Sequence, residues 1–282
     1  MANNKIAFQG ALGAYSHKAC LDAFPNRPVL PCKDFAEAFK AVESGKAKSA
    51  MIPIDNSIAG RVADIHHLLP KSDLKIIAEQ FIPIHHCIMA LPSVKLKDIK
   101  EVYSHVHALP QCKKFIKQNK IKPIVFGDTA GAAKYVSEDS NKSIAAIASA
   151  TAAELYGLKI LKKNIEDVSD NVTRFVILEK RANIPAYRKD KEFITSLIFS
   201  TRNIPAALYK AMGGFATNGV NFLKLESYLE GSKFHSASFY CEIEGHPKNK
   251  LCANALEELE FFSDKVTYLG TYEKHAYRNK KK

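Results

Sequence analysis

Apolar runs of strand length alternate with amphipathic segments along the first 180 residues. Lys5–Gln9 and Ser49–Ile54 are such runs, and Asp34–Ser44 carries apolar residues at helical spacing behind an aspartate suited to cap it. A last strand is predicted at Arg174–Glu179. This alternation predicts an α/β domain with a mostly parallel sheet, which binds ligands beyond the carboxyl ends of its strands. The intervening strands are predicted at 75–82, 85–91, 101–104, 121–126 and 143–148, and the intervening helices at 62–69, 109–118, 129–137 and 150–156.

The pattern changes after a polar stretch that contains Pro185, which we interpret as a linker. Beyond it the predicted order is strand, helix, strand, strand, helix, strand, which is the order of a ferredoxin-like unit. An open strand edge in such a unit often pairs with a second copy. The predicted elements are 193–200, 204–217, 221–229, 235–244, 248–261 and 265–270. The predicted domains are 1–181, a linker at 182–191, 192–272 and a basic tail at 273–282, of which the dense basic tract 278–282 is expected to fray.

Composition narrows the class of protein. A chain of 282 residues suits two domains, and 46% hydrophobic with 25% charged residues is ordinary for a globular protein. No apolar run reaches the length of a membrane span, and the first strand follows the N-terminus directly, so we expect a cytoplasmic protein without membrane contact. The six cysteines form no paired motif, which favours reduced, buried thiols over disulfides or zinc ligands.

The net charge of +12 does not by itself indicate a nucleic-acid partner, because the basic residues are spread along the chain. Only seven of the 41 basic residues are arginine. In a chain that prefers lysine this strongly, an arginine among other polar residues is a candidate for a site that needs a planar, two-pronged donor. Arg174 is such a residue.

Two polar clusters follow the first strands of the predicted sheet. Gly10 and Gly13 lie in the first turn, where glycines let the backbone approach a ligand and the next helix offers free N–H groups to an anion. A tight turn of any strand and helix gives the same pattern. Asp55-Asn56-Ser57 interrupts the end of an apolar strand, and these residues are suited either to cap the next helix or to bind a ligand.

Two further clusters lie later in the chain. Ser104 stands at a strand end with Gln111 about two helical turns beyond, and both are hydrogen-bonding groups, not bases. Thr173-Arg174-Phe175 places a hydroxyl, a guanidinium and an aromatic ring together at the start of the last strand, although strand alternation sends Arg174 away from the other two. A surface arginine on an edge strand is the alternative. Nearby histidine pairs lack acidic partners at ligand spacing, so no metal is expected.

These clusters together resemble the prephenate dehydratase family, from about Lys5 to Thr271. The resemblance implies a periplasmic-binding-protein-like fold of two lobes with the active site in the cleft between them. The chain begins at its dehydratase strand, so a monofunctional enzyme without a fused mutase domain is expected. The matching segments, in chain order, are Asp55-Asn56-Ser57, Ser104 with Gln111, the Thr/Ala-rich turn at 128–133, the run at 145–158, and Thr173-Arg174-Phe175.

The C-terminal part resembles an ACT domain, which implies L-phenylalanine as an allosteric ligand bound between two copies in a homodimer or homotetramer. Ala206 stands where glycine is usual, and Tyr228-Leu229 where Arg-Pro is usual, so the strength and identity of the effector stay open. The effector-binding positions implied by the resemblance are Pro205, Ala206, Ala207, Leu208, Asn221, Phe222, Leu223, Leu225, Glu226 and Ser227.

The resemblance implies conversion of prephenate to phenylpyruvate, water and CO₂ without any cofactor, because formation of the aromatic ring drives the reaction. Thr173 is then the donor to the departing hydroxyl and Arg174 the carboxylate-binding group, while the ultimate proton source stays open. Arogenate dehydratase shares all these motifs, and a non-catalytic amino-acid-binding regulator is the alternative from another class. The groups expected to orient the substrate are Asn56, Ser57, Ser104, Gln111, Thr129 and Phe175, with Asp55 positioning its neighbours.

Overall fold

The computed structural model describes residues 4–181, 183–202, 204–229 and 237–279. The chain divides into two compact units, one of Met1–Val62 with Gln80–Phe175 and one of Ala63–Glu79 with Val176–Lys282. It passes between them after Val62 and again inside two long strands, β5 (Lys75–Pro83) and β11 (Val172–Glu179). The division therefore does not fall at the predicted linker, because local patterning identifies elements but not which distant segments pack together.

Two sheets form the first unit. The first has the order β2-β1-β3-β11-β5, with β4 paired to β3, and β1 runs parallel to both β2 and β3. Asp34 caps α2 through its side chain, as predicted, by accepting from the Glu37 backbone N–H. The elements of this part are β1 (Ile6–Gln9), α1 (Tyr15–Ala23), β2 (Val29–Cys32), α2 (Phe35–Glu43), β3 (Ser49–Asn56) and β4 (Gly60–Arg61).

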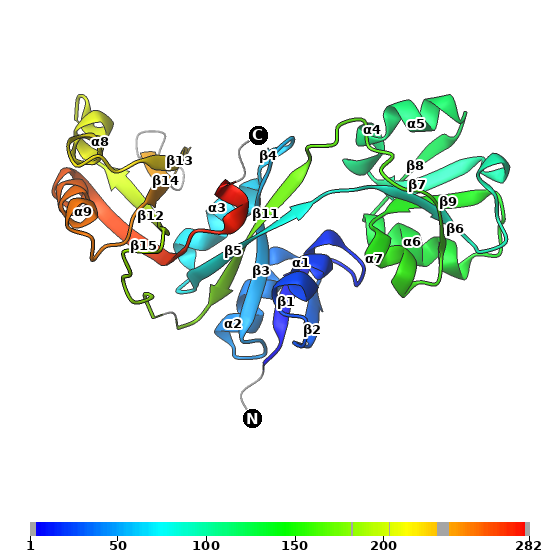
Figure 1. The fold of residues 1–282 in the computed structure, drawn as a ribbon, viewed down its shortest axis with the longest axis horizontal. Helices are drawn as coiled ribbons and strands as arrows, with labels where there is room; N and C mark the ends of the chain where they lie inside the picture. The colour runs from blue at the N-terminus through cyan, green and yellow to red at the C-terminus, as the bar shows by residue number, and fades with distance from the viewer. Residues whose placement is uncertain (1–3, 182, 203, 230–236, 280–282) are drawn as a thin grey trace. The chain divides into compact units, whose positions relative to one another are not determined.

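The second sheet has the order β10-β6-β9-β7-β8. β7 is parallel to β8 and β9, whereas β6 is antiparallel to β9 and β10, so the mostly parallel sheet that we predicted is mixed here. Ile88 and Met89 of β6 enter different core clusters, with helices on both faces of the sheet (Figure 1). The elements are β6 (Cys87–Ala90), β7 (Glu101–His105), α4 (Ala108–Gln111), α5 (Lys113–Gln118), β8 (Lys122–Phe126), α6 (Thr129–Glu138), β9 (Ile144–Ala148), α7 (Ala150–Leu155) and β10 (Lys159–Lys162).

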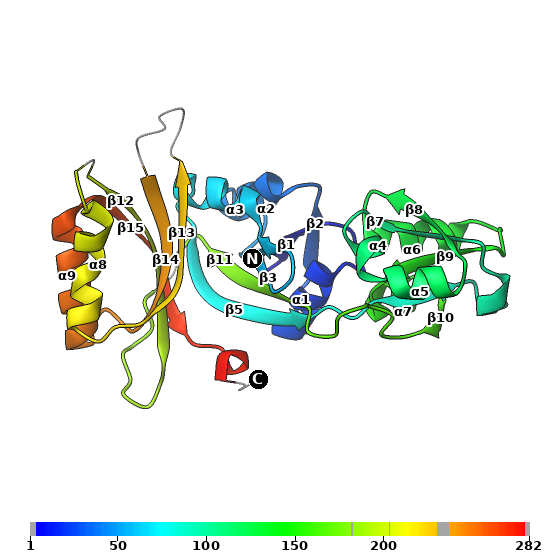
Figure 2. The ribbon, with the colours of Figure 1, turned by 90° about the horizontal axis from the view of Figure 1, so that it is seen from above.

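The second unit contains an antiparallel sheet of order β13-β14-β12-β15 with two helices on one face, α8 and α9 (Figure 2). Leu197, Phe199 and Cys241 alternate along the strands toward this helical face and pack into one core cluster. The order βαββαβ is confirmed. The elements are β12 (Phe193–Thr201), α8 (Ala207–Thr217), β13 (Phe222–Leu229), β14 (Ala237–Glu244), α9 (Lys250–Phe262) and β15 (Ser263–Glu273), joined in this unit by α3 (Ala63–Leu68), η1 (Leu69–Lys71) and the start of β5.

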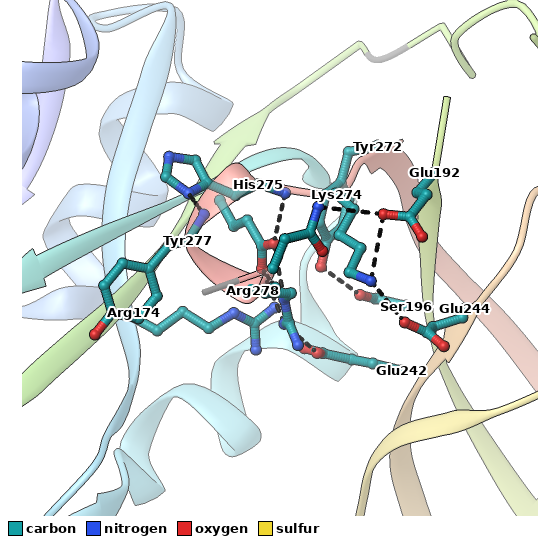
Figure 3. Close-up of polar contacts among 12 residues, drawn as sticks. Arg174, Glu192, Ser196, Glu242, Glu244, Tyr272, Lys274, His275, Tyr277 and Arg278 are labelled. Atoms are coloured by element: carbon teal, nitrogen blue, oxygen red, sulfur yellow. Dashed lines mark hydrogen bonds and ion pairs between the residues drawn. The ribbon is translucent and has the colours of Figure 1, made fainter. Parts of the chain in front are cut away.

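The other face of that sheet is polar and yet buried. Glu242 of β14 is 0% exposed and Glu79 of β5 is 4% exposed. Arg278, in the short helix η3 (Ala276–Asn279), donates three bonds to Glu79, at 2.8, 3.1 and 2.9 Å. It donates one more to Glu242, at 3.1 Å (Figure 3). The expectation that residues 278–282 fray is therefore wrong for residues 278 and 279, and residues 280–282 lie outside the described part of the chain. Arg278 is thus bonded to two buried carboxylates, and its removal would leave both without this partner.

No helix in the described residues is long and apolar enough to cross a membrane.

Candidate active site

Asn56, at the end of β3, organises a set of amide side chains in the first unit. Its Oδ1 accepts from the backbone N–H groups of Ile58 and Ala59, at 3.0 and 2.8 Å. Its Nδ2 donates to Asn171 Oδ1 at 2.6 Å and to Thr173 Oγ1 at 3.0 Å. An asparagine amide has two acceptor positions and two N–H groups, so Asn56 is saturated by the protein.

The set of hydrogen bonds continues from Asn171 toward the second sheet. Asn171, 1% exposed, donates through Nδ2 to Gln111 Oε1 at 2.9 Å. The same oxygen lies 3.0 Å from Nε2 of His86, which is 2% exposed, and the other ring nitrogen of His86 lies 3.1 Å from the Tyr15 hydroxyl. We call Tyr15, His86, Gln111, Asn171, Asn56 and Thr173 the amide network.

Burial shifts the pKa values of the two titratable members of the amide network, His86 and Tyr15. It lowers the pKa of His86 below that of a free imidazole and raises the pKa of the Tyr15 phenol well above its ordinary value. His86 is therefore neutral near pH 7 and Tyr15 stays protonated. Glu166 holds the same segment by accepting from the His86 backbone N–H at 2.9 Å and bonding the His85 ring at 2.8 Å.

The glycine turn predicted as a candidate site packs against α7. Gly13 has φ +91°, and a Cβ there would lie 3.0 Å from the Ala152 Cα, so glycine is required for both reasons. Ser149 donates to the Gly13 carbonyl at 2.6 Å. The helix that follows, α1, begins after Ala14, whose side chain cannot cap it. Its first turn therefore has no side-chain cap, and binding of an anion there stays a prediction.

Arg174 is buried to 6% exposure and pairs with Asp55, with Nη1 and Oδ2 3.2 Å apart. Asp55 precedes Asn56 on β3, and Arg174 follows Thr173 on β11. Successive side chains of a strand point to opposite faces, so the ion pair and the Asn56–Thr173 bond lie on opposite faces of the sheet. This placement agrees with the strand alternation expected from the sequence, and joint contact of Thr173 and Arg174 with one ligand stays a prediction. Asp55 thus contacts a neighbouring strand through Arg174, and its positioning role stays a prediction.

The other predicted substrate-binding residues are used within the protein. Ser57 Oγ donates to the Asp170 carbonyl and accepts from the Val172 N–H, both at 2.9 Å. Ser104, fully buried, donates to the Ile147 carbonyl at 2.6 Å. Phe175 is 1% exposed in the core, and Thr129 is the half-buried first residue of α6. These placements indicate positioning roles for Asn56, Ser57, Ser104 and Phe175, and direct contact with a ligand stays a prediction.

Three members of the amide network were not among the predicted site residues. Tyr15 follows the glycine turn and Asn171 precedes the Thr-Arg-Phe segment, so both stood beside clusters that the sequence did single out. His86 gave no such signal, because it is one of an adjacent histidine pair in an apolar run. Across residues 4–181, 183–202, 204–229 and 237–279, no group of three or more His, Cys, Asp or Glu side chains is arranged to hold a metal ion.

The predicted effector positions lie at one end of α8 and along β13. Ala206 is the residue before α8 and has the left-handed φ of +58°. β13 is an edge strand of its sheet, and Leu225 on it is 37% exposed. Glu226 pairs with Lys224 at 3.2 Å, and Asn221 donates to Glu244. The remaining positions, Pro205, Ala207, Leu208, Phe222, Leu223 and Ser227, range from buried Ala207 to exposed Pro205 and Ser227.

Comparison with known proteins gives one consistent result. The family described as "Prephenate dehydratase" matches residues 6–183 of this chain. A protein of Komagataeibacter europaeus, named as a bifunctional N-acyl-homoserine lactone acylase/prephenate dehydratase, is 45% identical over 98% of each chain. An arogenate dehydratase/prephenate dehydratase of Arabidopsis thaliana is 39% identical over 95% of this chain and 71% of its own.

A solved structure extends the comparison to the arrangement of the elements. It is the prephenate dehydratase of Arthrobacter aurescens in complex with L-Phe, which superposes with a TM-score of 0.86 at 29% identity. The match covers 96% of this chain and 90% of that protein. The similarity therefore includes both compact units, not the family segment alone.

Proposed function

Because this chain belongs to the prephenate dehydratase family, whose members are enzymes of the hydro-lyase type, we propose that it converts prephenate to phenylpyruvate, CO₂ and water. In this reaction the bond between the ring and its carboxylate breaks, and the electron pair enters the ring. The ring becomes aromatic as the C4–O bond breaks, and the departing hydroxide takes a proton to leave as water. The enzyme must hold a dianion and supply a donor at that oxygen.

The observation that carries the proposal is the state of the Thr173 hydroxyl. Its oxygen accepts from Asn56 Nδ2 at 3.0 Å, and the described part of the chain contains no acceptor for its proton. The hydroxyl is thus held as a donor for a group that the protein does not itself provide. A donor at the departing oxygen stabilises charge as it develops, which is the help that this reaction needs.

We assign the carboxylate contacts to groups on the Thr173 side of the sheet. The Nε2 of Gln111 has no partner among the described residues, and the first turn of α1 has no side-chain cap. Both are donors, and Tyr15 joins the start of α1 to the amide network. Arg174, held by Asp55 on the other face, supports β3 and β11 in this account.

The test is a substrate assay with matched Thr173 variants. Thr173→Ala removes the donor and is expected to lower kcat by about 10²-fold or more, while Thr173→Ser keeps a hydroxyl and part of the rate. Turnover of prephenate and of arogenate is followed by mass spectrometry, because arogenate dehydratase is the alternative. An N-acyl-homoserine lactone is tested as a third substrate, since one relative is also named as an acylase of such lactones. An Ala variant with wild-type turnover would refute the Thr173 role.

We further propose that L-phenylalanine binds the second unit and inhibits the enzyme. Support comes from the βαββαβ order, from the edge strand β13, and from the relative of known structure that binds L-Phe. Inhibition requires that the ligand favour one conformation by differential affinity. A ligand between two copies would also link inhibition to the oligomeric state.

A further inference from the structure

We propose that His86 is a positioning residue, which fixes the orientation of the Gln111 amide and so presents the Gln111 N–H₂ group, beside the Thr173 hydroxyl, as a donor to the substrate. The part that concerns the substrate rests on the proposed function. The part that concerns the hydrogen-bond polarity of the protein does not. The two parts are tested by different measurements.

At one end of the amide network, backbone groups fix which atoms donate hydrogen bonds and which accept them. Backbone N–H groups only donate, and those of Ile58 and Ala59 both point at one oxygen of Asn56. That atom is therefore Oδ1, and the opposite side of the Asn56 amide must be the nitrogen. Asn56 then gives one N–H to Asn171 and the other to Thr173.

The orientation of Asn56 then determines the orientation of each of the next amides in the network, because every donor must face an acceptor. Asn171 must turn its oxygen toward Asn56, so its nitrogen faces Gln111 and donates at 2.9 Å. Gln111 must therefore turn its oxygen toward Asn171. That same oxygen lies 3.0 Å from His86 Nε2, and two acceptors cannot bond, so His86 must carry its proton on Nε2.

His86 closes the network at the far end. In the neutral ring with the proton on Nε2, Nδ1 is an acceptor, and the Tyr15 hydroxyl 3.1 Å away supplies a proton that it shares with the His85 carbonyl at 2.8 Å. The edge of the His86 ring also packs against the Tyr15 ring, with centroids 5.8 Å apart. His86 and Asn171 are almost fully buried, so water does not compete for these bonds.

The consequence is a pair of oriented donors. With its oxygen held by both His86 and Asn171, Gln111 turns Nε2 away from the network, where no described residue bonds it. Thr173 likewise keeps its proton for a ligand. Without the His86 N–H, the Gln111 oxygen is held by one bond, and the amide is free to turn over and offer an acceptor where a carboxylate of the substrate needs a donor.

The tautomer is measured on the full chain without substrate. Two-bond ¹H–¹⁵N correlation spectra of histidine-labelled protein distinguish the two neutral forms, and the His86→Gln variant assigns the His86 signals. His17 and His246 serve as internal references, because backbone N–H groups of Gly13 and Lys248 donate to their Nδ1 atoms. We expect His86 to carry its proton on Nε2. A proton on Nδ1 alone would overturn the inference, whatever the enzyme turns over.

The role in catalysis is measured with a matched pair of variants. His86→Gln keeps an N–H donor for Gln111, and His86→Glu has nearly the same shape but offers only acceptors when ionised. We expect His86→Gln to keep kcat within about fivefold, and His86→Glu to lower kcat by about 10²-fold, as a misplaced catalytic group does. Equal kcat values for the two variants at equal thermal stability would refute the positioning role.

Two further outcomes are distinguishable. If His86→Glu does not fold, His86→Leu replaces it in the comparison with His86→Gln, and equal rates again count against the inference. If the wild-type chain turns over neither prephenate nor arogenate, the proposed function fails. The spectra still decide whether the donor polarity of the amide network is as we infer.

Discussion

At the scale of single residues, the candidate site is best understood by counting donors and acceptors. Asn56 has all four positions filled by the protein, whereas Thr173 and Gln111 each keep a donor without a described partner. Hydrogen bonds to the protein offset the cost of burying a saturated side chain, which then holds its neighbours, while an unsatisfied donor in a partly buried site is suited to a ligand. This distinction separates positioning residues from ligand-binding residues, although the sequence presents them as one group of polar motifs.

Ala206 gives a prediction at the same scale. It has φ +58° and ψ +25°, a region that costs a residue with a Cβ about 1–2 kcal/mol. Ala206→Gly removes that strain but adds about 0.4–1 kcal/mol of unfolded-state entropy, so we expect a net gain of about 0.5 kcal/mol in the free energy of unfolding. Ala207→Gly, one residue into α8, is the control and should lose about 1 kcal/mol. Urea unfolding measures both, and a loss in both variants would contradict the prediction.

At the scale of elements, the short helix η3 at the end of the chain holds β5 to β14 through Arg278. Arg278→Ala leaves Glu79 and Glu242, whose side chains are 0% exposed, without this cation (Figure 3). Removing one partner of a buried ion pair costs about 3–5 kcal/mol, because the remaining charge stays buried. We expect a loss of about 3 kcal/mol in the free energy of unfolding, measured by denaturant titration.

The control for this prediction is another arginine of the second unit. Arg188 pairs with Asp190 two residues away, with the two side chains 58% and 63% exposed. Exposed pairs contribute little, so Arg188→Ala should change the free energy of unfolding by less than about 0.5 kcal/mol. Equal losses in the two variants would mean that the Arg278 pairs do not stabilise the unit.

At the scale of the whole molecule, regulation has to be tested on the full chain. The second compact unit includes Ala63–Glu79 from the N-terminal half, so a truncation near Arg181 would strip packed residues from that segment. Substitutions on the edge strand β13 avoid this problem. Leu225 is 37% exposed there, and a lysine on an edge strand opposes pairing with another strand.

We expect the wild-type chain to be a dimer or tetramer in light scattering and to be inhibited by L-phenylalanine. Leu225→Lys should lower the mass measured by light scattering. It should also raise the phenylalanine concentration needed for half-maximal inhibition by about tenfold or more, with basal turnover retained. Leu251→Lys is the matched control, since Leu251 is 55% exposed on α9, and should change neither property. Calorimetric titration that detects no phenylalanine binding to the wild-type chain would refute this model of regulation.

The sequence by itself determined most of the longer elements and their order, but not the short strands β2 and β10. Strand and helix signals depend on local periodicity, so β1, α2, β3 and the βαββαβ order of the second unit follow from the residues present in each segment. Motifs at strand ends singled out Asn56, Gln111 and Thr173 of the amide network, because ligands of α/β sheets bind at strand ends. Even the capping of α2 by Asp34 could be predicted, since a cap involves only neighbours in the chain.

Only the tertiary structure decided what those residues do. It joined Ala63–Glu79 to the C-terminal unit, ordered the tail as far as residue 279 through Arg278, and paired the buried Arg174 with Asp55. It also brought His86 to Gln111, 25 residues apart, and Asn56 to Asn171, 115 residues apart. Hydrogen-bond polarity and the burial of charge depend on such distant partners, and the free energy of a polar group is set by the partner it finds, not by its place in the sequence.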